Sequence, residues 1–218
     1  MSNRLPVNYF SDVLCVWAYI NEWRYDEVET NLGGDLDIQL HFLPNFASVH
    51  AKIESGWGQR GGFEGYANHV REVAASFEVP VHSDTWINVR PTTSMIPHAV
   101  IKGAVALHGV AKARMLAKSL RVAFFQRGED ISQLDIIQTV VVALGLDWQG
   151  LYDRFLNGEA LAELNLDFNL AKDYQISVSP AWVFNEGRQK LIGNVGYRVI
   201  EANLKELIDH KPSAHAWC

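Results

Sequence analysis

The chain has 218 residues, of which 48% are hydrophobic and 20% charged, a composition typical of a globular protein that buries a sizeable core. Its formal net charge is −6, its sequence pI is near 5.7, and it contains no long basic run. Binding to nucleic acid or to an anionic membrane surface needs clustered Lys and Arg, so we expect neither partner. The length suits one domain, or one domain with a large insertion.

The N-terminus runs almost directly into an apolar strand, without the apolar core and small-residue cleavage site of a secretory signal. We therefore expect a cytoplasmic protein. The chain has only two cysteines, Cys15 and Cys218, which are too few for a disulfide scaffold and should stay reduced unless they are catalytic. The eight histidines show no metal-ligand spacing, so we expect no metal.

The start of the chain predicts a strand, a helix and a second strand. Residues 5–10 are a short apolar stretch typical of a strand, and a helix is predicted over 16–31. In 36–43 apolar and polar residues alternate, which indicates a half-buried strand. The glycine-rich segment 56–65 follows, and we expect it to be a flexible loop that acts as a lid next to Cys15.

The middle of the chain has helical periodicity, with apolar residues recurring every three or four positions. The predicted helices are one after a cap at Thr93 or Ser94, one over 112–127 that ends at Gly128, one from a cap at Ser132 to Gly145, and two near 148–156 and 158–172.

The strand pattern returns at 181–185 and 189–193, and an amphipathic helix is predicted over 196–209. Strands this few and this far apart must share one sheet, so the helical middle is predicted to be an insertion. The expected organisation is an α/β domain formed by 1–44 and 173–218, interrupted by a helical domain at 45–172.

Cys15 stands at the predicted start of the first helix. Backbone N–H groups and the helix dipole at such a position stabilise a thiolate, so we expect a pKa below the usual value near 8.5 and a nucleophilic sulfur. The alternative is that Cys15 is a small buried apolar residue, as most free cysteines are.

Pro180 immediately precedes the strand at 181–185. A proline here can adopt a cis peptide bond beside a nucleophile and leave the preceding backbone exposed to a thiol or peptide ligand. The alternative is an ordinary proline at a strand start. The βαβ and ββα order would bring Pro180 close to Cys15, so the two features together favour an active site over the two alternatives.

Three stretches resemble the DsbA family of thioredoxin-fold proteins: "YFSDVLCVWAYI", "LRVAFFQRGEDISQLDIIQTVVVALGLD" and "SPAWVFNEGRQKLIGNVGYRVIEANLKEL". The likeness is to the cytosolic DsbA-like oxidoreductases and, more distantly, to 2-hydroxychromene-2-carboxylate isomerases and kappa-class glutathione transferases. It implies a thioredoxin-like fold with a large all-helical insertion.

The resemblance also implies glutathione as a cofactor and a small-molecule thiol or substrate as the partner, and it leaves a homodimer open. Glutathione would lie against a cis-Pro backbone. The residues that the resemblance implies for binding glutathione or substrate are Trp17, Ala18, Ser179 and Pro180, together with Asn88, Arg90 and His98.

The chain departs from the family's Cys-X-X-Cys pattern, because the four positions are Cys15, Val16, Trp17 and Ala18. The attacking cysteine is present and the resolving cysteine is an alanine. A mixed disulfide at Cys15 could then be released only by an outside thiol or a distant one.

Three hypotheses follow from this departure. In the first, Cys15 works as a single thiolate with glutathione or another external thiol, as an oxidoreductase or as a glutathione-dependent isomerase or transferase. In the second, Cys218 resolves the mixed disulfide from the C-terminal residues 211–218, which we expect to be a mobile tail. In the third, the chain is a non-catalytic module that binds an apolar ligand in a cleft lined by Trp17, Trp57, Phe63 and Trp182.

Overall fold

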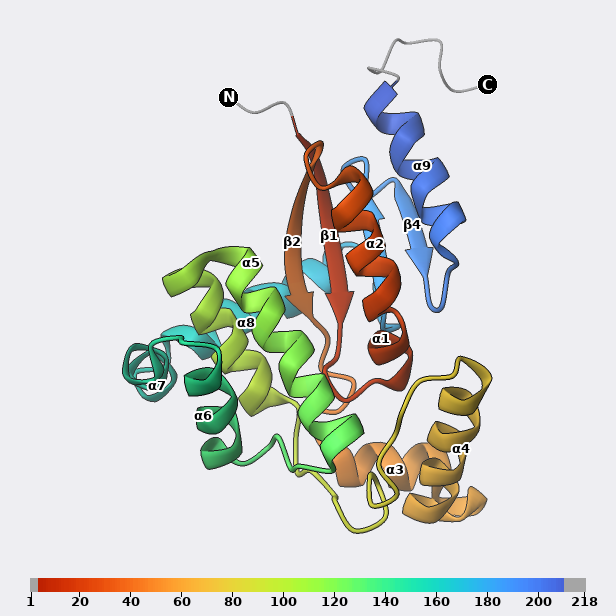
Figure 1. Ribbon diagram of the computed structural model, residues 1–218, viewed down its shortest axis with the longest axis vertical. Coiled ribbons are helices and arrows are strands. Elements are labelled where there is room, and N and C mark those ends of the chain that lie inside the picture. Colours follow the sequence, from red (N-terminus) through yellow and green to blue (C-terminus); the bar gives the residue numbers. More distant parts are fainter. Residues whose placement is uncertain (1–3, 210–218) are drawn as a thin grey trace.

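The computed structural model describes residues 4–209, so the predictions for Cys218 and the C-terminal tail lie outside the described residues. The elements in chain order are β1 (Leu5–Ser11), α1 (Val16–Ile20), α2 (Glu22–Leu32), β2 (Leu36–Phe42), α3 (Val49–Trp57), the short 3-10 helix η1 (Gly58–Arg60), α4 (Gly62–Ser76), α5 (Met95–Arg127), α6 (Leu134–Ala143), α7 (Trp148–Leu156), α8 (Glu159–Asp173), β3 (Ala181–Phe184), β4 (Gln189–Ile192) and α9 (Tyr197–Asp209) (Figure 1).

The four strands form one sheet in the order β2-β1-β3-β4. β1 is parallel to β2, with Val7 opposite Ile38, and antiparallel to β3, with Tyr9 opposite Trp182. β4 pairs antiparallel with the other edge of β3. Strands from the two ends of the sequence therefore share one sheet, as the sequence predicts, and every residue of β3 is buried.

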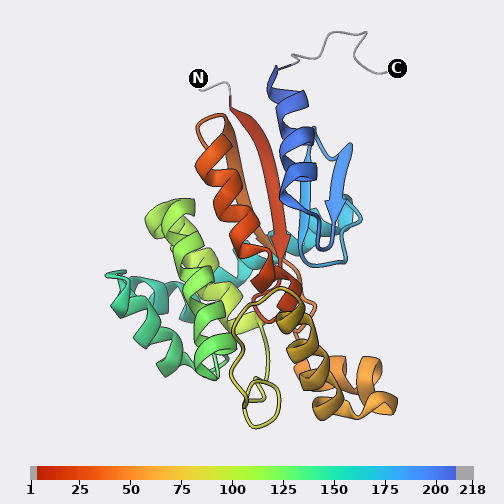
Figure 2. The same cartoon turned by 45° about the vertical axis from the view of Figure 1, so that its right-hand side comes forward.

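Helices cover both faces of the sheet. α2 and α9 pack side by side on one face, and α8 passes behind the other (Figures 1 and 2). Under α2 the rings of Tyr9, Tyr25 and Trp182 pack against one another, with centroids 4.7–5.2 Å apart. Trp182 is completely buried in this group, so it does not line the apolar cleft expected for a binding module.

Every described helix from α3 to α8 lies in sequence between β2 and β3, which makes this a thioredoxin-like fold with a large helical insertion. The insertion lies beyond the carboxyl ends of β1 and β2 (Figure 1). α5 consists of two arms, because Gly109 has a φ of 80° and a ψ of 168° inside it. The second arm ends at Gly128, whose φ is 64°, as the glycine pattern predicts.

The expected flexible lid at 56–65 is wrong, because this segment is almost entirely helical. It contains the end of α3, all of η1 and the start of α4, and the chain reverses at Gly61 and Gly62 with φ values of 90° and 56°. Gly65 lies inside α4, where an added Cβ would stand 1.8 Å from the carbonyl oxygen of Arg60. The glycines therefore serve a tight helix-helix turn and a close backbone approach.

Two predicted helix starts also differ from the structure. The helix expected over 16–31 is divided at Asn21, which caps both α1 and α2. The cap predicted at Ser132 is wrong, because α6 begins at Leu134 with Gln133 as its N-cap. The Ser132 hydroxyl instead accepts from the backbone N–H of Thr92 and donates to Asp130.

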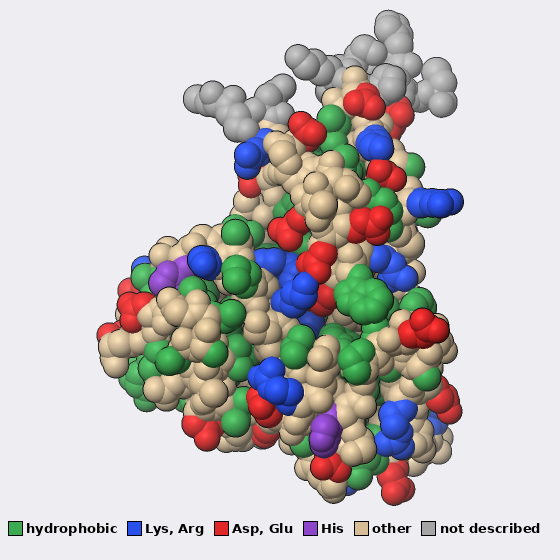
Figure 3. All heavy atoms as spheres, viewed as in Figure 1, with side chains coloured by type: hydrophobic (Ala, Val, Ile, Leu, Met, Phe, Trp, Pro, Cys, Tyr) green, Lys and Arg blue, Asp and Glu red, His purple; other side chains and the backbone are tan. Residues whose placement is uncertain are grey.

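Ion pairs join α2 to the second arm of α5. The buried Glu22 contacts both Arg114 and Arg121, and Asp26 contacts Arg114 and Lys118. Acidic and basic side chains are correspondingly interspersed on the face drawn in Figure 3. Within residues 4–209, no helix combines the length and hydrophobicity that crossing a bilayer requires, and no cluster of three or more His, Cys, Asp or Glu could hold a metal ion.

Candidate active site

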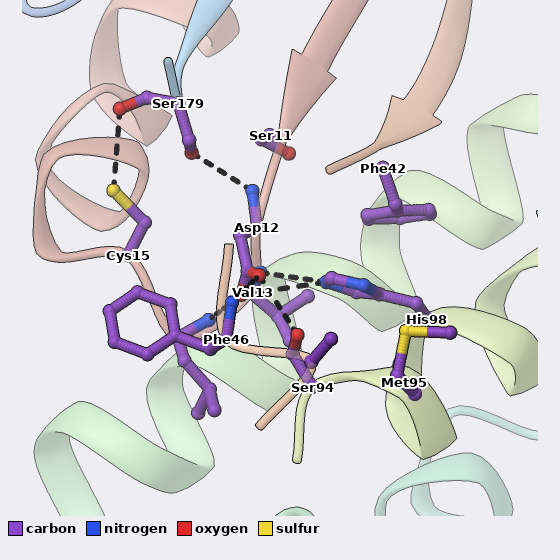
Figure 4. Close-up of polar contacts among 12 residues, drawn as sticks. Ser11, Asp12, Val13, Cys15, Phe42, Phe46, Ser94, Met95, His98 and Ser179 are labelled. Carbon is purple, nitrogen blue, oxygen red and sulfur yellow. Dashed lines mark hydrogen bonds and ion pairs between the residues drawn. The ribbon is translucent and has the colours of Figure 1, made fainter. Parts of the chain in front are cut away.

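Cys15 lies where β1 turns into α1. It is the N-cap of α1, with extended backbone angles, and its N–H donates to the carbonyl of Asp12 at 3.1 Å. Its thiol donates to the backbone carbonyl of Ser179 at 3.4 Å, and the Ser179–Pro180 peptide bond is cis (Figure 4). The fold thus brings together two segments that are far apart in the sequence, and the thiol faces the backbone just before the proline.

The expected lowering of the Cys15 pKa is wrong. The side chain is buried, and burial raises the pKa of the thiol above its usual value. The Ser179 side chain and the backbone N–H groups of Ala18 and Trp17 only partly oppose this effect, and the charge of Asp12 raises the pKa further. α1 has only five residues, so its dipole is small. Donation of the thiol proton to the Ser179 carbonyl also favours the protonated form.

Ala18 and Trp17 lie in the first turns of α1, directly after Cys15. Ala18 is completely buried, and its side chain offers no group that could resolve a disulfide. Trp17 is half-buried and meets the ring of Phe77 edge-on, with centroids 6.1 Å apart. The backbone N–H groups of both residues lower the pKa of the thiol, against the larger effect of burial, so they act on it through the main chain.

Asp12 is a residue of this site that the sequence reasoning missed. Its carboxylate is completely buried and accepts from the N–H groups of Leu14 and Phe46 and from the hydroxyl of Ser94, at 2.8–2.9 Å (Figure 4). Its own N–H donates to the Ser179 hydroxyl at 2.9 Å. Burial raises the pKa of Asp12 to about 6, against the opposing effect of its hydrogen bonds and of the positive charge on Arg121.

His98 is buried under the same turn. Its Nε2 accepts the N–H of Val13 at 3.0 Å, so the ring proton is on Nδ1 and the imidazole is neutral. Burial, and then the charge of Arg121, lower the pKa of His98 well below its usual value. His98 is completely buried and meets the site at the backbone of Val13 and at the carboxylate of Asp12, 3.6 Å from its Nε2. Its role as a substrate contact stays a prediction.

Asn88 and Arg90 lie on the loop before α5. Asn88 is exposed and donates to Asp84, while Arg90 lies over the ring of Phe63 and donates to the carbonyl of Ile87. No contact recorded among residues 4–209 joins either side chain to Cys15. Their role as substrate contacts stays a prediction.

Tyr66 is a second residue that the sequence reasoning missed, because its segment follows the supposed loop. α4 packs against α1, and the buried Tyr66 has a pKa well above its usual value, owing first to burial and then to the charges of Cys15 and Asp12. Its ring belongs to an aromatic group with Phe46, Trp57 and Trp86. The insertion therefore places this aromatic group on the helix that packs against α1.

Comparison with known proteins agrees with this geometry. A family model described as thioredoxin matches residues 9–203. Comparison with curated proteins gives no match. Among solved structures, a probable DsbA oxidoreductase from Streptomyces coelicolor superposes with a TM-score of 0.74 and 15% identity, over 96% of this chain and 92% of its own.

Two further structures are similar. The cytosolic disulfide reductase DsbM from Pseudomonas aeruginosa, solved with GSH, has a TM-score of 0.67 and 18% identity over 92% of this chain and 100% of its own. A 2-hydroxychromene-2-carboxylate isomerase has a TM-score of 0.66 and 15% identity over 93% and 96%. The chain belongs to the thioredoxin family whose model matches residues 9–203, and it has the DsbA-like form of the thioredoxin fold.

Proposed function

We propose that this protein is a thiol-disulfide exchange enzyme that uses Cys15 as its single active-site thiol and glutathione as the external thiol. The observation that carries the proposal is the contact between the Cys15 sulfur and the carbonyl of Ser179, next to the cis Pro180, with Ala18 in the position of a resolving cysteine. The GSH-bound relative supports the choice of thiol.

The backbone before Pro180 fits a thiol ligand. Among residues 4–209 the N–H of Ser179 has no recorded hydrogen-bond partner, and its carbonyl is occupied only by the thiol of Cys15. An extended ligand can therefore bind along this backbone with its sulfur next to Cys15. Glutathione, a short peptide with a central thiol, has that form.

The exchange proceeds in two balanced steps. After losing its proton to solvent, the Cys15 thiolate attacks one sulfur of a substrate disulfide, forms a mixed disulfide and releases the other sulfur as a thiolate. A glutathione thiolate then attacks the substrate sulfur of the mixed disulfide, which frees Cys15 and leaves glutathione joined to the substrate. Because burial raises the pKa of Cys15, the first step should speed up as the pH rises.

Mass spectrometry after incubation with oxidised glutathione tests the proposal in a C218S background. We expect one glutathione adduct, on Cys15, that persists until reduced thiol is added. The matched variant is A18C, which restores a second thiol: its adduct should collapse to an internal disulfide between position 18 and Cys15. An unmodified Cys15 in the C218S protein would contradict thiol exchange and favour the binding-module hypothesis.

A second candidate is a glutathione-dependent isomerase or transferase, favoured by the protonated state of Cys15. A thiol that donates to the Ser179 carbonyl could instead donate to the thiolate of bound glutathione and stabilise it. The variants C15S and C15A separate the two candidates. Serine keeps a donor, so C15S should retain glutathione-thiolate binding if this second candidate is right, whereas disulfide exchange should be abolished in both variants.

A further inference from the structure

The carboxylate of Asp12 attaches the Cys15 turn, residues 12–15, to the helical insertion. Oδ1 of Asp12 accepts the N–H of Leu14 at 2.9 Å, within the turn itself. Oδ2 accepts the N–H of Phe46, in the segment after β2, at 2.9 Å and the hydroxyl of Ser94, the N-cap of α5, at 2.8 Å. One carboxylate therefore holds three separate segments in a fixed relation (Figure 4).

The main chain of Asp12 reaches the other half of the site. Its N–H donates to the hydroxyl of Ser179, and its carbonyl accepts the N–H of Cys15. The residue thus contacts both the nucleophile's own backbone and the loop that carries the cis-proline. We propose that Asp12 is a positioning residue of the Cys15 site, which locks the turn against the insertion and sets the reactivity of the thiol through its own protonation state.

The groups around Asp12 make its charge depend on pH. The only ion-pair contact recorded for Asp12 among residues 4–209 is with Nε2 of His98 at 3.6 Å, and that nitrogen accepts the N–H of Val13, so His98 is neutral. The other ionisable groups that act on Asp12 or feel its charge are Arg121 on α5, Cys15 on the turn and Tyr66 on α4, which stays protonated. Neutral donors alone hold the carboxylate, and burial raises its pKa to about 6.

Ionisation of Asp12 has a direct consequence for Cys15. A negative charge near the sulfur disfavours a second negative charge, so the thiol is harder to deprotonate above about pH 6 than below it. A plot of the logarithm of the Cys15 alkylation rate against pH should therefore flatten near pH 6 before it rises again. A residue with a purely structural role would scale this profile without changing its shape.

The experiment measures alkylation of Cys15 by iodoacetamide from about pH 5 to about pH 9, in the C218S background so that one thiol reports. We expect D12N to lose the flattening and to react roughly tenfold faster at pH 8, because the like-charge repulsion on the thiolate is removed. S94A keeps the charge and removes one donor, so the flattening should move to higher pH. S94A also keeps the test valid if D12N folds poorly.

The matched control is D167N, which alters another buried carboxylate that accepts a backbone N–H, from Phe42, but within residues 4–209 has no recorded contact with the Cys15 turn. Its profile should keep the wild-type shape. Profiles of unchanged shape in D12N and S94A, or the same change in D167N, would overturn the proposal. The inference builds on Cys15 as the reactive group of the proposed function, but alkylation needs no glutathione, so a failure to form the glutathione adduct is a separate result.

Discussion

Two buried carboxylates in this protein are held in opposite ways. Asp167 on α8 contacts the ammonium group of Lys102 at 2.9 Å and Nδ1 of His41 at 2.7 Å, and it accepts the N–H of Phe42 at 3.0 Å. Asp12 is also buried, but it is held by two backbone N–H groups and the Ser94 hydroxyl, and within residues 4–209 no Lys or Arg contacts it. The first carboxylate has a partner of opposite charge, and the second has only neutral donors.

The difference shows what each carboxylate can do. The carboxylate paired with a cation joins α5, α8 and β2 through charge-assisted hydrogen bonds. A buried carboxylate held by neutral donors is stabilised less, and burial raises the pKa of Asp12 to about 6. Asp12 therefore changes its charge near neutral pH, beside Cys15.

Removing the cation of the Asp167 group should give the largest effect. We expect K102M to lower the free energy of unfolding by about 3–5 kcal/mol, because Asp167 would be left buried without its counter-charge. Urea denaturation measures the loss. K172M, at an exposed lysine of α8, is the control and should change little; a K102M protein as stable as the control would remove the contrast between the two carboxylates.

The pH dependence of the free energy of unfolding should reveal the titration of the Asp12 carboxyl. Its folded-state pKa, about 6, is above the ordinary value of 3.8, so its contribution to stability is present below about pH 4 and is lost as the pH rises through 6. Relative to D12N, the wild-type protein should lose about 2.5 kcal/mol between pH 4 and pH 8.

The test compares how the difference in free energy of unfolding between the two proteins changes with pH, and not its size at one pH, because D12N also places an amide donor against the N–H of Phe46. Urea titrations at several pH values measure this difference. If the difference between the two proteins stayed constant with pH, Asp12 would not titrate with a raised pKa.

The smallest effect is expected for S94A. A hydrogen bond to a charged group contributes about 1.5–3 kcal/mol, so S94A should cost roughly 2 kcal/mol at pH 8, where Asp12 is ionised. The cost should fall towards pH 5, where the carboxyl carries a proton. Thermal unfolding at the two pH values measures this, with S132A as a control whose hydroxyl donates to Asp130 instead; an equal cost of S94A at both values would contradict the neutral-donor account.

Much of the fold could be predicted because its signals are local. Alternation in 36–43 and the apolar runs at 5–10 and 181–185 correspond to β2, β1 and β3, and Gly128 ends α5 with a positive φ. The glycines of 56–65 were misinterpreted for a physical reason. Glycine serves both mobile loops and close helix packing, and only the distance from Gly65 to Arg60 distinguishes the two.

The candidate site was predicted in part. Cys15 and Ser179 were expected to meet because strands on either side of an insertion must share a sheet, and their contact is present. The pKa of Cys15 was predicted in the wrong direction, since helix position alone gives no information on burial. Asp12, His98 and Tyr66 have no spacing that marks them, and their roles depend on which segments pack against the turn.

The sequence by itself determined the strand order and most of the helices, the position of Cys15 and the absence of a resolving thiol at Ala18, because these depend on residue type and short-range pattern. Only the tertiary structure decided the ionisation of the site. The pKa values of Cys15 and Asp12 depend on burial and on donors contributed by Phe46, Ser94 and Ser179, which lie far along the chain and come within hydrogen-bond distance only when the insertion packs against the sheet.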